Sequence, residues 1–235
     1  MKQVDVVIIS WAKDDSLKAV TKAGLDSLFN SDKGDIAFNA IVIESNPEVN
    51  YDEYNQFLWM HSCKTIHPTV PFGYHRYLNL GVRESNSPYV VLCNSDLTYE
   101  KGWASSIIDL MEAHPDFLSA SPWCPETQGS NENHKGLIYE GNRVRGELAG
   151  WCIFQQRKIY DILGELDEDF EFWYCDNSYS EELKRHGIKH GLVPDSIVHH
   201  HGEVLGKTGM TLSHEEQVKI TVDQEKIFTK KYVNQ

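Results

Sequence analysis

The sequence predicts an α/β fold in which a mainly parallel central sheet is flanked by helices. Residues 4–10 form a run of mostly β-branched side chains, which is typical of a strand covered on both faces. Residues 15–30 then repeat apolar side chains at helical spacing. Two further apolar runs, at 40–44 and 89–93, are predicted strands. Because strands that alternate with helices are joined by right-handed crossovers, these runs predict a parallel sheet.

The rest of the chain is predicted to contain shorter elements and one long irregular segment. Between residues 122 and 146, Pro, Gly, Asn and Glu replace the regular pattern. Such a long connection is unusual inside a compact domain and indicates a binding loop or a lid. The other expected elements are a short strand at 64–66, helices at 157–163, 177–186 and 213–232, and a strand at 190–193.

Length and composition fit one compact domain. The chain has 235 residues, of which 40% are hydrophobic, enough to bury a sizeable core. No run approaches the ~20 apolar residues of a membrane span, and the first residues lack the apolar segment of a signal peptide. We therefore expect no membrane contact and a cytoplasmic location. The five cysteines are scattered without a Cys-x-x-Cys pair, which indicates reduced thiols rather than disulfides or a thiolate zinc site.

The formal net charge of −13 limits the ligands that the surface can attract. Broad capture of nucleic acid needs a basic surface that releases counterions from phosphates, so the charge argues against it and leaves room only for a local basic cleft. An acidic protein that binds a diphosphate needs a cation between the two negative partners. The composition therefore favours a divalent metal.

Polar side chains follow two of the predicted strands. Glu44 ends the second strand, and Asn94-Ser95-Asp96 follows the fourth. In a parallel sheet the carboxyl ends of the strands form the ligand crevice, where a carboxylate such as Asp96 can hold a hard cation through oxygen. The same tripeptide is also ordinary turn or helix-cap chemistry, and this alternative stays open.

Asp176 and a run of histidines are two further candidates. Asp176 lies among aromatic residues at a predicted helix start, where partial burial would raise its pKa into the range of a general base. It could equally cap the helix. In an extended strand, neighbouring side chains point to opposite faces. Either His200 or the pair His199 and His201 can therefore face a metal, but not all three.

Taken in order, these segments resemble the family 2 glycosyltransferases of the GT-A fold, from Val4 to about Gly202. Two positions depart from the family pattern, because Asn94 stands for the first acid of Asp-x-Asp and Cys175 for the Glu of Glu-Asp. The residues expected to act as the general base therefore match the family pattern less well than those expected to bind the metal. The matching segments are 72–81 with its Asn-x-Gly, 89–103 with the Asp-x-Asp strand and the following Gly-Trp, 150–154 and 164–170 on the acceptor side, Asp176 of the Glu-Asp motif, and 200–202 with the late histidine.

The resemblance implies one Rossmann-like GT-A domain over residues 1–235. Residues 1–100 would be the nucleotide-sugar-binding half and 101–235 the acceptor-side half. The expected donor is a nucleoside-diphosphate sugar, with UDP as its nucleotide. The residues implied in donor binding are Ser10, Trp11, Glu44, Asn79, Asn94, Ser95 and Trp151.

The resemblance also implies a mechanism. Asp96 and His200 would hold Mn2+ or Mg2+, which neutralises charge on the departing nucleoside diphosphate. Asp176 would take the proton of the acceptor hydroxyl as that oxygen attacks the anomeric carbon from the opposite face, which inverts the anomeric centre. The 122–146 segment would close over the site as a lid.

The acceptor has two candidate classes. The wording of residues 38–46 and 118–122 resembles small glycosyltransferases of T-even-like phages, some of which add sugar to hydroxymethylated cytosine in DNA. The alternative is a saccharide or lipid-linked acceptor. A DNA acceptor needs a local basic rim, for which the C-terminal half offers Arg143, Arg145, Arg157, Lys158, Lys184, Arg185 and Lys189.

Two other functions compete with sugar transfer. Asn94 and Cys175 could be the eroded acids of a protein that binds a nucleotide-sugar and transfers nothing. A nucleotidyltransferase on a similar scaffold is disfavoured, because residues 11–14 follow the first strand where a Gly-rich phosphate loop would be expected.

Overall fold

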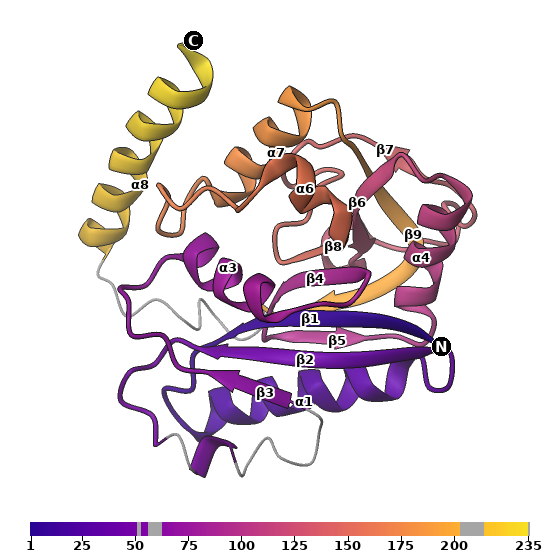
Figure 1. Cartoon of the computed structure of the whole chain (residues 1–235), viewed down its shortest axis with the longest axis horizontal. Helices are drawn as coiled ribbons and strands as arrows, with labels where there is room; N and C mark the ends of the chain where they lie inside the picture. The colour runs from indigo at the N-terminus through magenta and orange to yellow at the C-terminus, as the bar shows by residue number, and fades with distance from the viewer. Residues whose placement is uncertain (51–52, 56–62, 203–213, 235) are drawn as a thin grey trace.

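The described residues form a mixed sheet of nine strands at the centre of the protein, with helices on both faces (Figure 1). The structure is a computed structural model that describes residues 1–50, 53–55, 63–202 and 214–234. Within these ranges, no helix has both the length and the apolar character needed to cross a membrane.

The first half of the chain forms the predicted alternation of strands and helices. In chain order its elements are β1 (Lys2–Ser10), α1 (Asp15–Ser31), β2 (Ile36–Glu44), β3 (Cys63–Ile66), α3 (Tyr74–Glu84), β4 (Tyr89–Asn94) and β5 (Leu97–Tyr99). The four strands and the helix predicted up to residue 93 are confirmed, whereas α3 and β5 were not predicted. The parallel register sets Ser10 beside Glu44 and Ile9 beside Asn94, so three strand ends meet at one edge of the sheet.

The second half adds the elements that complete the sheet. They are α4 (Trp103–Ala113), β6 (Phe117–Trp123), α5 (Pro125–Gln128), β7 (Tyr139–Glu140), β8 (Cys152–Gln156), a 3-10 turn (Arg157–Ile159), α6 (Tyr160–Leu163), α7 (Cys175–Arg185), β9 (Lys189–His200), α8 (His214–Phe228) and a π-helical turn (Thr229–Val233). The predicted helices at 157–163 and 177–186 are confirmed with small shifts of their ends. The predicted strand at 190–193 is longer, because β9 continues into the histidines. The 122–146 segment is not structureless, since it contains α5 and β7.

The strand order is β3-β2-β1-β4-β8-β6-β9-β5, and β7 pairs with β9. β8 runs antiparallel to both β4 and β6, while β6 and β9 are parallel. Strands β3, β2, β1, β4, β6 and β9 therefore point one way, and β8, β5 and β7 point the other. The predicted mainly parallel sheet is confirmed, with β8 as a reversed strand near its middle.

Apolar side chains fill both faces of the sheet. On the face of the sheet covered by α1 and α4, Trp103 of α4 is fully buried. Its ring stacks on that of Phe38, with the ring centroids 6.0 Å apart. On the opposite face, Leu78 of α3 and Leu183 of α7 are buried in a second core that includes Val7 of β1. The residues on either side of Val7 belong to the first core, as the period-two alternation of a strand requires.

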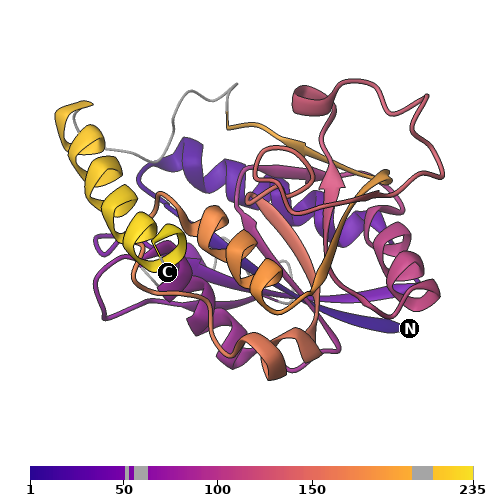
Figure 2. The same ribbon diagram turned by 90° about the horizontal axis from the view of Figure 1, so that it is seen from above.

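Helix α8 lies beside α7 at the edge of the domain (Figure 2). Arg185 of α7 donates a hydrogen bond to the carbonyl of Lys231 at 2.8 Å and covers the ring of Tyr232 at 4.4 Å. The ammonium group of Lys231 in turn pairs with Asp167 and Asp169. The C-terminal turn is thereby fixed to the segment that precedes α7.

Helix α3 approaches β1 so closely that a side chain at residue 81 would overlap its neighbour. A Cβ atom at Gly81 would clash with Cγ1 of Val7 and lie 2.9 Å from its Cγ2. We expect Gly81→Ala to destabilise the protein by about 1–3 kcal/mol, the range for overpacked cores. At an open helix position the same change stabilises by about 1 kcal/mol through helix propensity. The sign of the change in urea unfolding therefore tests the contact, and a gain in stability would contradict it.

Candidate active site

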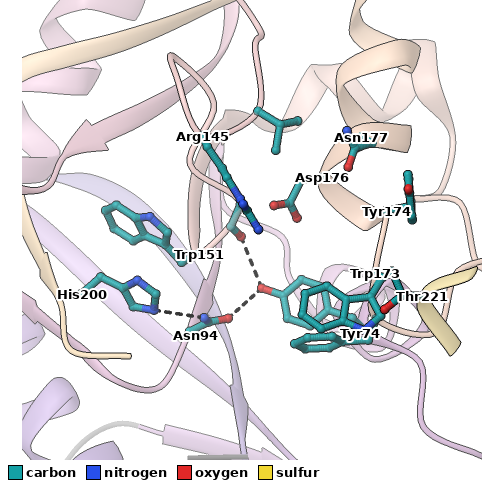
Figure 3. A pocket seen from close by; sticks show the side chains of 13 residues that line it. Tyr74, Asn94, Arg145, Trp151, Trp173, Tyr174, Asp176, Asn177, His200 and Thr221 are labelled. Atoms are coloured by element: carbon teal, nitrogen blue, oxygen red, sulfur yellow. Dashed lines mark hydrogen bonds between the residues drawn. The ribbon is translucent and has the colours of Figure 1, made fainter. Parts of the chain in front are cut away.

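A cavity of about 650 Å³ opens at the carboxyl ends of β4 and β9 (Figure 3). Its walls come from parts of the chain that are far apart in sequence, so the cavity exists only in the complete fold. They are Tyr74 at the start of α3, Asn94 of β4, residues within 144–151, residues within 172–177, His200 of β9 and Thr221 of α8.

His200 lines one corner of this cavity, and Asp96, which is not among the lining residues, lies beside it. Nε2 of His200 is 3.5 Å from Oδ1 of Asp96 and 3.5 Å from Nδ2 of Asn94. The imidazole stacks on the indole of Trp151, with ring centroids 5.2 Å apart. The side chains of His200 and Asp96 are 20% and 15% exposed, so a ligand can reach both. A carboxylate oxygen and an imidazole nitrogen are donors that suit a divalent cation.

The protein supplies two potential ligands at this corner. Within the described ranges, no group of three or more His, Cys, Asp or Glu side chains could hold a metal ion. A cation bound between Asp96 and His200 would therefore need further ligands from a substrate or from water.

The register of β9 distinguishes the three histidines. The ring of His199 lies between two carboxylates, 2.8 Å from Glu100 and 2.7 Å from Glu126. Burial lowers the pKa of His199, but these carboxylates outweigh burial and raise it above its usual value. His201 hydrogen-bonds a threonine of β5. Of the alternatives that the sequence leaves open, His200 is the histidine that faces Asp96.

Asp176 lies in the first turn of α7, across the cavity from His200 (Figure 3). Burial raises the pKa of its carboxyl group, and the charge of Arg145 opposes this shift without cancelling it. Gly150 packs directly against the carboxylate, because a Cβ atom at this position would overlap it. A carboxyl group with a raised pKa at a cavity wall is suited to accept a proton.

The hydroxyl of Tyr74 connects the two sides of the cavity. It donates a hydrogen bond to Oδ1 of Asn94 at 2.9 Å and lies 3.3 Å from the carbonyl oxygen of Gly150. Burial raises the pKa of Tyr74 well above its usual value, so the phenol stays neutral and remains a donor. Sequence patterns did not single out this tyrosine, because its role depends on the approach of α3 to β4.

Three donor-site candidates gather at the ends of β1 and β2. Oε1 of Glu44 accepts the backbone N–H groups of Ala12 at 2.9 Å and Asn46 at 2.8 Å. Among the described residues, Oε2 of Glu44 and the indole N–H of Trp11 are buried without a partner. Ser10 is buried beside them in the register of the strands. Buried unpaired groups are costly and mark a place for a ligand, although these residues do not line the cavity itself.

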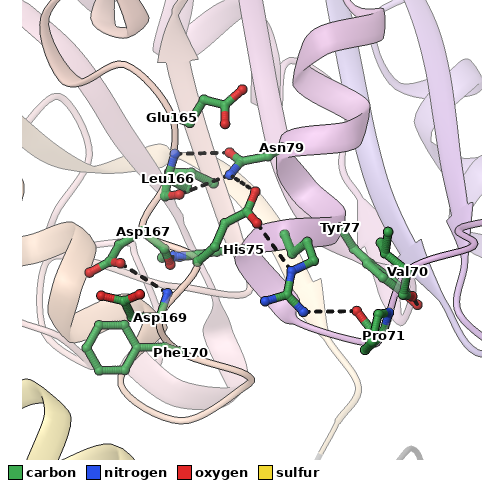
Figure 4. Close-up of polar contacts among 12 residues, drawn as sticks. Val70, Pro71, His75, Tyr77, Asn79, Glu165, Leu166, Asp167, Asp169 and Phe170 are labelled. Carbon is green, nitrogen blue, oxygen red and sulfur yellow. Dashed lines mark hydrogen bonds and ion pairs between the residues drawn. The ribbon is translucent and has the colours of Figure 1, made fainter.

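Two further donor-site candidates, Asn79 and Ser95, also lie outside the cavity lining. The amide of Asn79 donates to the carbonyl of Leu166 and to Glu168, both at 2.9 Å, and accepts the N–H of Leu166 at 3.0 Å (Figure 4). These bonds tie α3 to the segment before α7, so the amide is already occupied. The backbone carbonyl of Ser95 faces α1, where a Cβ atom at Gly24 would lie 3.0 Å from it.

Comparison with known proteins identifies the family. The model of "Glycosyl transferase family 2" matches residues 6–180, which is more than half of the chain. The chain belongs to glycosyl transferase family 2. Comparison of this family 2 chain with curated proteins gave no match.

Solved glycosyltransferase structures share the GT-A fold of this family 2 chain. A mannosyltransferase, PcManGT from Pyrobaculum calidifontis in complex with GDP-Man and Mn2+, superposes with a TM-score of 0.66 and 15% identity over 88% of this chain and 58% of its own. GalNAc-T7 with UDP, GalNAc and Mn2+ gives 0.66 and 15% over 84% of this chain and 43% of its own. S. aureus TarS 1-349 gives 0.60 and 11% over 98% and 72%. The chain thus spans less than two thirds of the first two structures.

The contact between Gly150 and Asp176 makes the family 2 site sensitive to one methyl group. We expect Gly150→Ala to displace the carboxylate and to lower sugar transfer or donor hydrolysis by roughly a hundredfold or more, the lower end of the effect of a general base. The protein should keep its fold, because a single short side chain moves. If the effect passes through Asp176, adding Gly150→Ala to Asp176→Asn should cost little more. Additive losses would contradict this coupling.

Proposed function

We propose that this protein transfers a sugar from a nucleoside-diphosphate sugar to an acceptor hydroxyl, in a reaction that needs a divalent cation and inverts the anomeric centre. The proposal rests on one observation: residues that can bind a cation and a carboxyl group that can accept a proton lie at the same cavity. Asp96 and His200 meet at one corner, Asp176 lies across from them, and Tyr74 and Asn94 bridge the two. Membership of family 2 supports this proposal, as do structural neighbours whose crystals contain GDP-Man or UDP with Mn2+.

The proposed cation is Mn2+ or Mg2+, held by Asp96 and His200. When bound, it supplies positive charge against the departing diphosphate. Asn94 lies beside this position. Because Oδ1 of Asn94 accepts the Tyr74 hydroxyl, its Nδ2 lies toward Nε2 of His200, the ring nitrogen that would bind the cation in its unprotonated form. Trp151 holds the ring in place by stacking.

Asp176 is the proposed base. It takes the proton of the acceptor hydroxyl as the new bond forms from that oxygen to the anomeric carbon, and the bond from this carbon to the diphosphate breaks. Attack from the face opposite the leaving group inverts the centre. The indoles of Trp151 and Trp173 line the walls and keep water from competing with the acceptor.

UDP is the proposed nucleotide, with Ser10, Trp11 and Glu44 around its base. The unpaired Oε2 of Glu44 needs an N–H donor, which uracil provides. Guanine also carries such donors, so UDP and GDP are the two nucleotides to compare.

Hydroxymethylcytosine in DNA is one candidate for the acceptor, and a saccharide or lipid-linked acceptor is the alternative. The basic residues expected to form a rim do not gather at the cavity. Arg157, Lys158 and Lys189 contact the amino-terminal ends of β4 and β6, away from the cavity. Arg145 alone of these residues lines the cavity and favours a local contact with phosphate, whereas the exposed Arg143 pairs with Glu147 outside it. Transfer to a hydroxymethylcytosine-containing duplex that weakens steeply with salt would favour DNA.

Asp96→Ala should abolish the metal-dependent part of nucleotide binding while leaving the fold intact. In the wild type, Mn2+ should enlarge the rise in melting temperature caused by UDP or GDP, since a ligand at a hundred times its Kd stabilises by about 2.7 kcal/mol. His200→Ala should behave like Asp96→Ala, and His201→Ala, whose ring hydrogen-bonds a threonine of β5, should behave like the wild type. If nucleotide binding by Asp96→Ala depended on Mn2+ as it does in the wild type, Asp96 would not be a ligand of the cation. No response of the wild type to any nucleotide would contradict the proposed function.

Asp176→Asn should preserve nucleotide binding and lower turnover by roughly a hundred- to ten-thousandfold. The pKa of Asp176 is raised in the folded protein, so its contribution to stability is present below the usual aspartate pKa and is lost as the pH rises through the raised value. The Asn variant should therefore melt at a higher temperature than the wild type at neutral pH, and the difference should shrink in acid. In the wild type, kcat/KM should fall as the pH drops below the raised pKa.

Thermal melts against pH and a pH–rate profile measure both effects. Loss of nucleotide binding in Asp176→Asn would show that Asp176 is not the base. A wild type that binds the donor but turns nothing over would favour the nucleotide-sugar-binding alternative.

A further inference from the structure

Two residues beside Asp176 hold a backbone conformation that costs free energy. In the described part of the chain, Arg145 (φ 62°) and Tyr174 (φ 64°) are the non-glycine residues with positive φ. Both line the cavity, one on the segment before β8 and one immediately before α7. Left-handed backbone is unfavourable for residues with a Cβ atom and persists mainly where function requires it. The strain therefore indicates a role for these two side chains.

The turn that carries Arg145 does not itself need an arginine. The N–H of Arg145 donates to the carbonyl of Leu148 at 3.1 Å, and the N–H groups of Gly146 and Leu148 donate to the carbonyl of Arg143 at 2.9 and 3.0 Å. A glycine at residue 145 would make the same backbone bonds with less strain. What arginine adds is its guanidinium group.

This guanidinium group reaches into the cavity near Asp176 (Figure 3). In the part of the chain that the structure describes, no carboxylate lies within ion-pair distance of Arg145, whereas Arg143 pairs with Glu147 at 3.0 Å. Burial raises the pKa of Asp176, and the unpaired charge of Arg145 works against this. An anion bound to Arg145 would neutralise that charge and make Asp176 a stronger base.

Trp173 and Tyr174 form an aromatic wall next to Asp176. The indole N–H of Trp173 is buried without a hydrogen-bond partner among the described residues. Its ring meets that of Phe172 edge to face, with centroids 5.0 Å apart. Aromatic walls with a few polar groups bind rings that carry polar substituents, and the free N–H can donate to an oxygen of such a ligand.

We propose that Arg145 binds a phosphate or carboxylate group of the acceptor, while the acceptor ring lies against Trp173 and Tyr174 and its hydroxyl faces Asp176. This inference rests on the proposed function and names its acceptor class, an anionic ring compound. The guanidinium group lies on the Asp176 side of the cavity, so this anion differs from the donor diphosphate at Asp96 and His200. A phosphorylated sugar and a nucleotide share this chemistry. Neither needs a wide basic surface, which the acidic chain lacks.

The test compares matched neutral and phosphorylated ligands. Glucose is paired with glucose 6-phosphate, and 5-hydroxymethyl-deoxycytidine with its 5′-monophosphate. Each is titrated calorimetrically into the protein saturated with UDP and Mn2+. In the wild type, the phosphorylated member of at least one pair should bind roughly ten- to a hundredfold more tightly, as a charge-assisted hydrogen bond allows. The pair that shows the difference identifies the source of the phosphate.

Three variants separate recognition from folding. Arg145→Ala should abolish the preference for the phosphorylated ligand. Arg145→Gly should also abolish it and should raise the melting temperature, because glycine relieves the strained backbone. Arg143→Ala is the matched control, since its exposed side chain lies on the same segment outside the cavity, and it should retain the preference. If Arg145 were merely structural, its replacement would change the melting temperature and leave the ratio of affinities unaltered.

Several outcomes would overturn the inference. Equal binding within both pairs would do so, as would no binding of any of the four ligands to the wild type. A lower affinity of Arg145→Ala for UDP with Mn2+, together with an unchanged preference, would assign Arg145 to the donor. UDP binding without the preference leaves the proposed function intact. If neither UDP nor GDP binds, the proposed function fails, and the pairs titrated into the protein alone should still show the preference.

Discussion

The hydrogen bond from Tyr74 to Asn94 is the interaction on which the geometry of the cavity depends. Tyr74 begins α3, and its N–H is bound at 2.6 Å by the carbonyl of Glu171 in the segment before α7. Its hydroxyl orients the Asn94 amide, and that amide in turn faces His200. A fully buried amide oxygen that lost its donor would cost about 1–3 kcal/mol, and the partly buried oxygen of Asn94 less, so the arrangement resists rotation of either side chain. A single partly buried contact thus relates the corner with Asp96 to the wall with Asp176.

The electrostatics of the cavity differ from those of the whole protein. The surface repels anions at a net charge of −13, yet the proposed donor carries a diphosphate. A negative field slows the approach of such ligands, and salt weakens this repulsion. Specific binding must then come from a few positive charges at short range. A cation at Asp96 and His200 would be one, and the guanidinium group of Arg145 is another. Their separation across the cavity would give two anions two distinct places.

The sequence predicted the parts of the fold that carry their own signal. The runs at 4–10 and 89–93 are buried on both faces, so their composition alone marks them as strands. Helix α3 was missed because Asn79 and Gly81 are poor helix formers, and packing of Gly81 on β1 outweighs this propensity. Helix α4 was also missed, although its apolar spacing from Ile107 to Met111 is visible in the sequence. Strand β8 is only five residues long and carries little pattern.

Candidate site residues at strand ends could be found in the same way, because Asp96 and Asp176 follow recognisable segments. The choice of His200 needed the register of β9 with β5, which joins residues far apart in sequence. Arg145 could be named only as one basic residue among several, since its strained turn has no sequence signature. Asn79 stands in a family motif, but the carbonyl and N–H of Leu166 occupy its amide. Nothing local in the sequence reveals that long-range partner.

The corner of the cavity at His200 shows the same dependence on distant parts of the chain, because Asn94 and His200 meet across 106 positions. During synthesis, β1 to β4 emerge first with their polar ends in place, while the edge of β4 that β8 will cover is still open. Unpaired edges invite association with other chains, and such non-local pairing forms slowly. A growing chain that stops before β8 would therefore carry the hazard of a bare edge on β4 and none of the chemistry of His200.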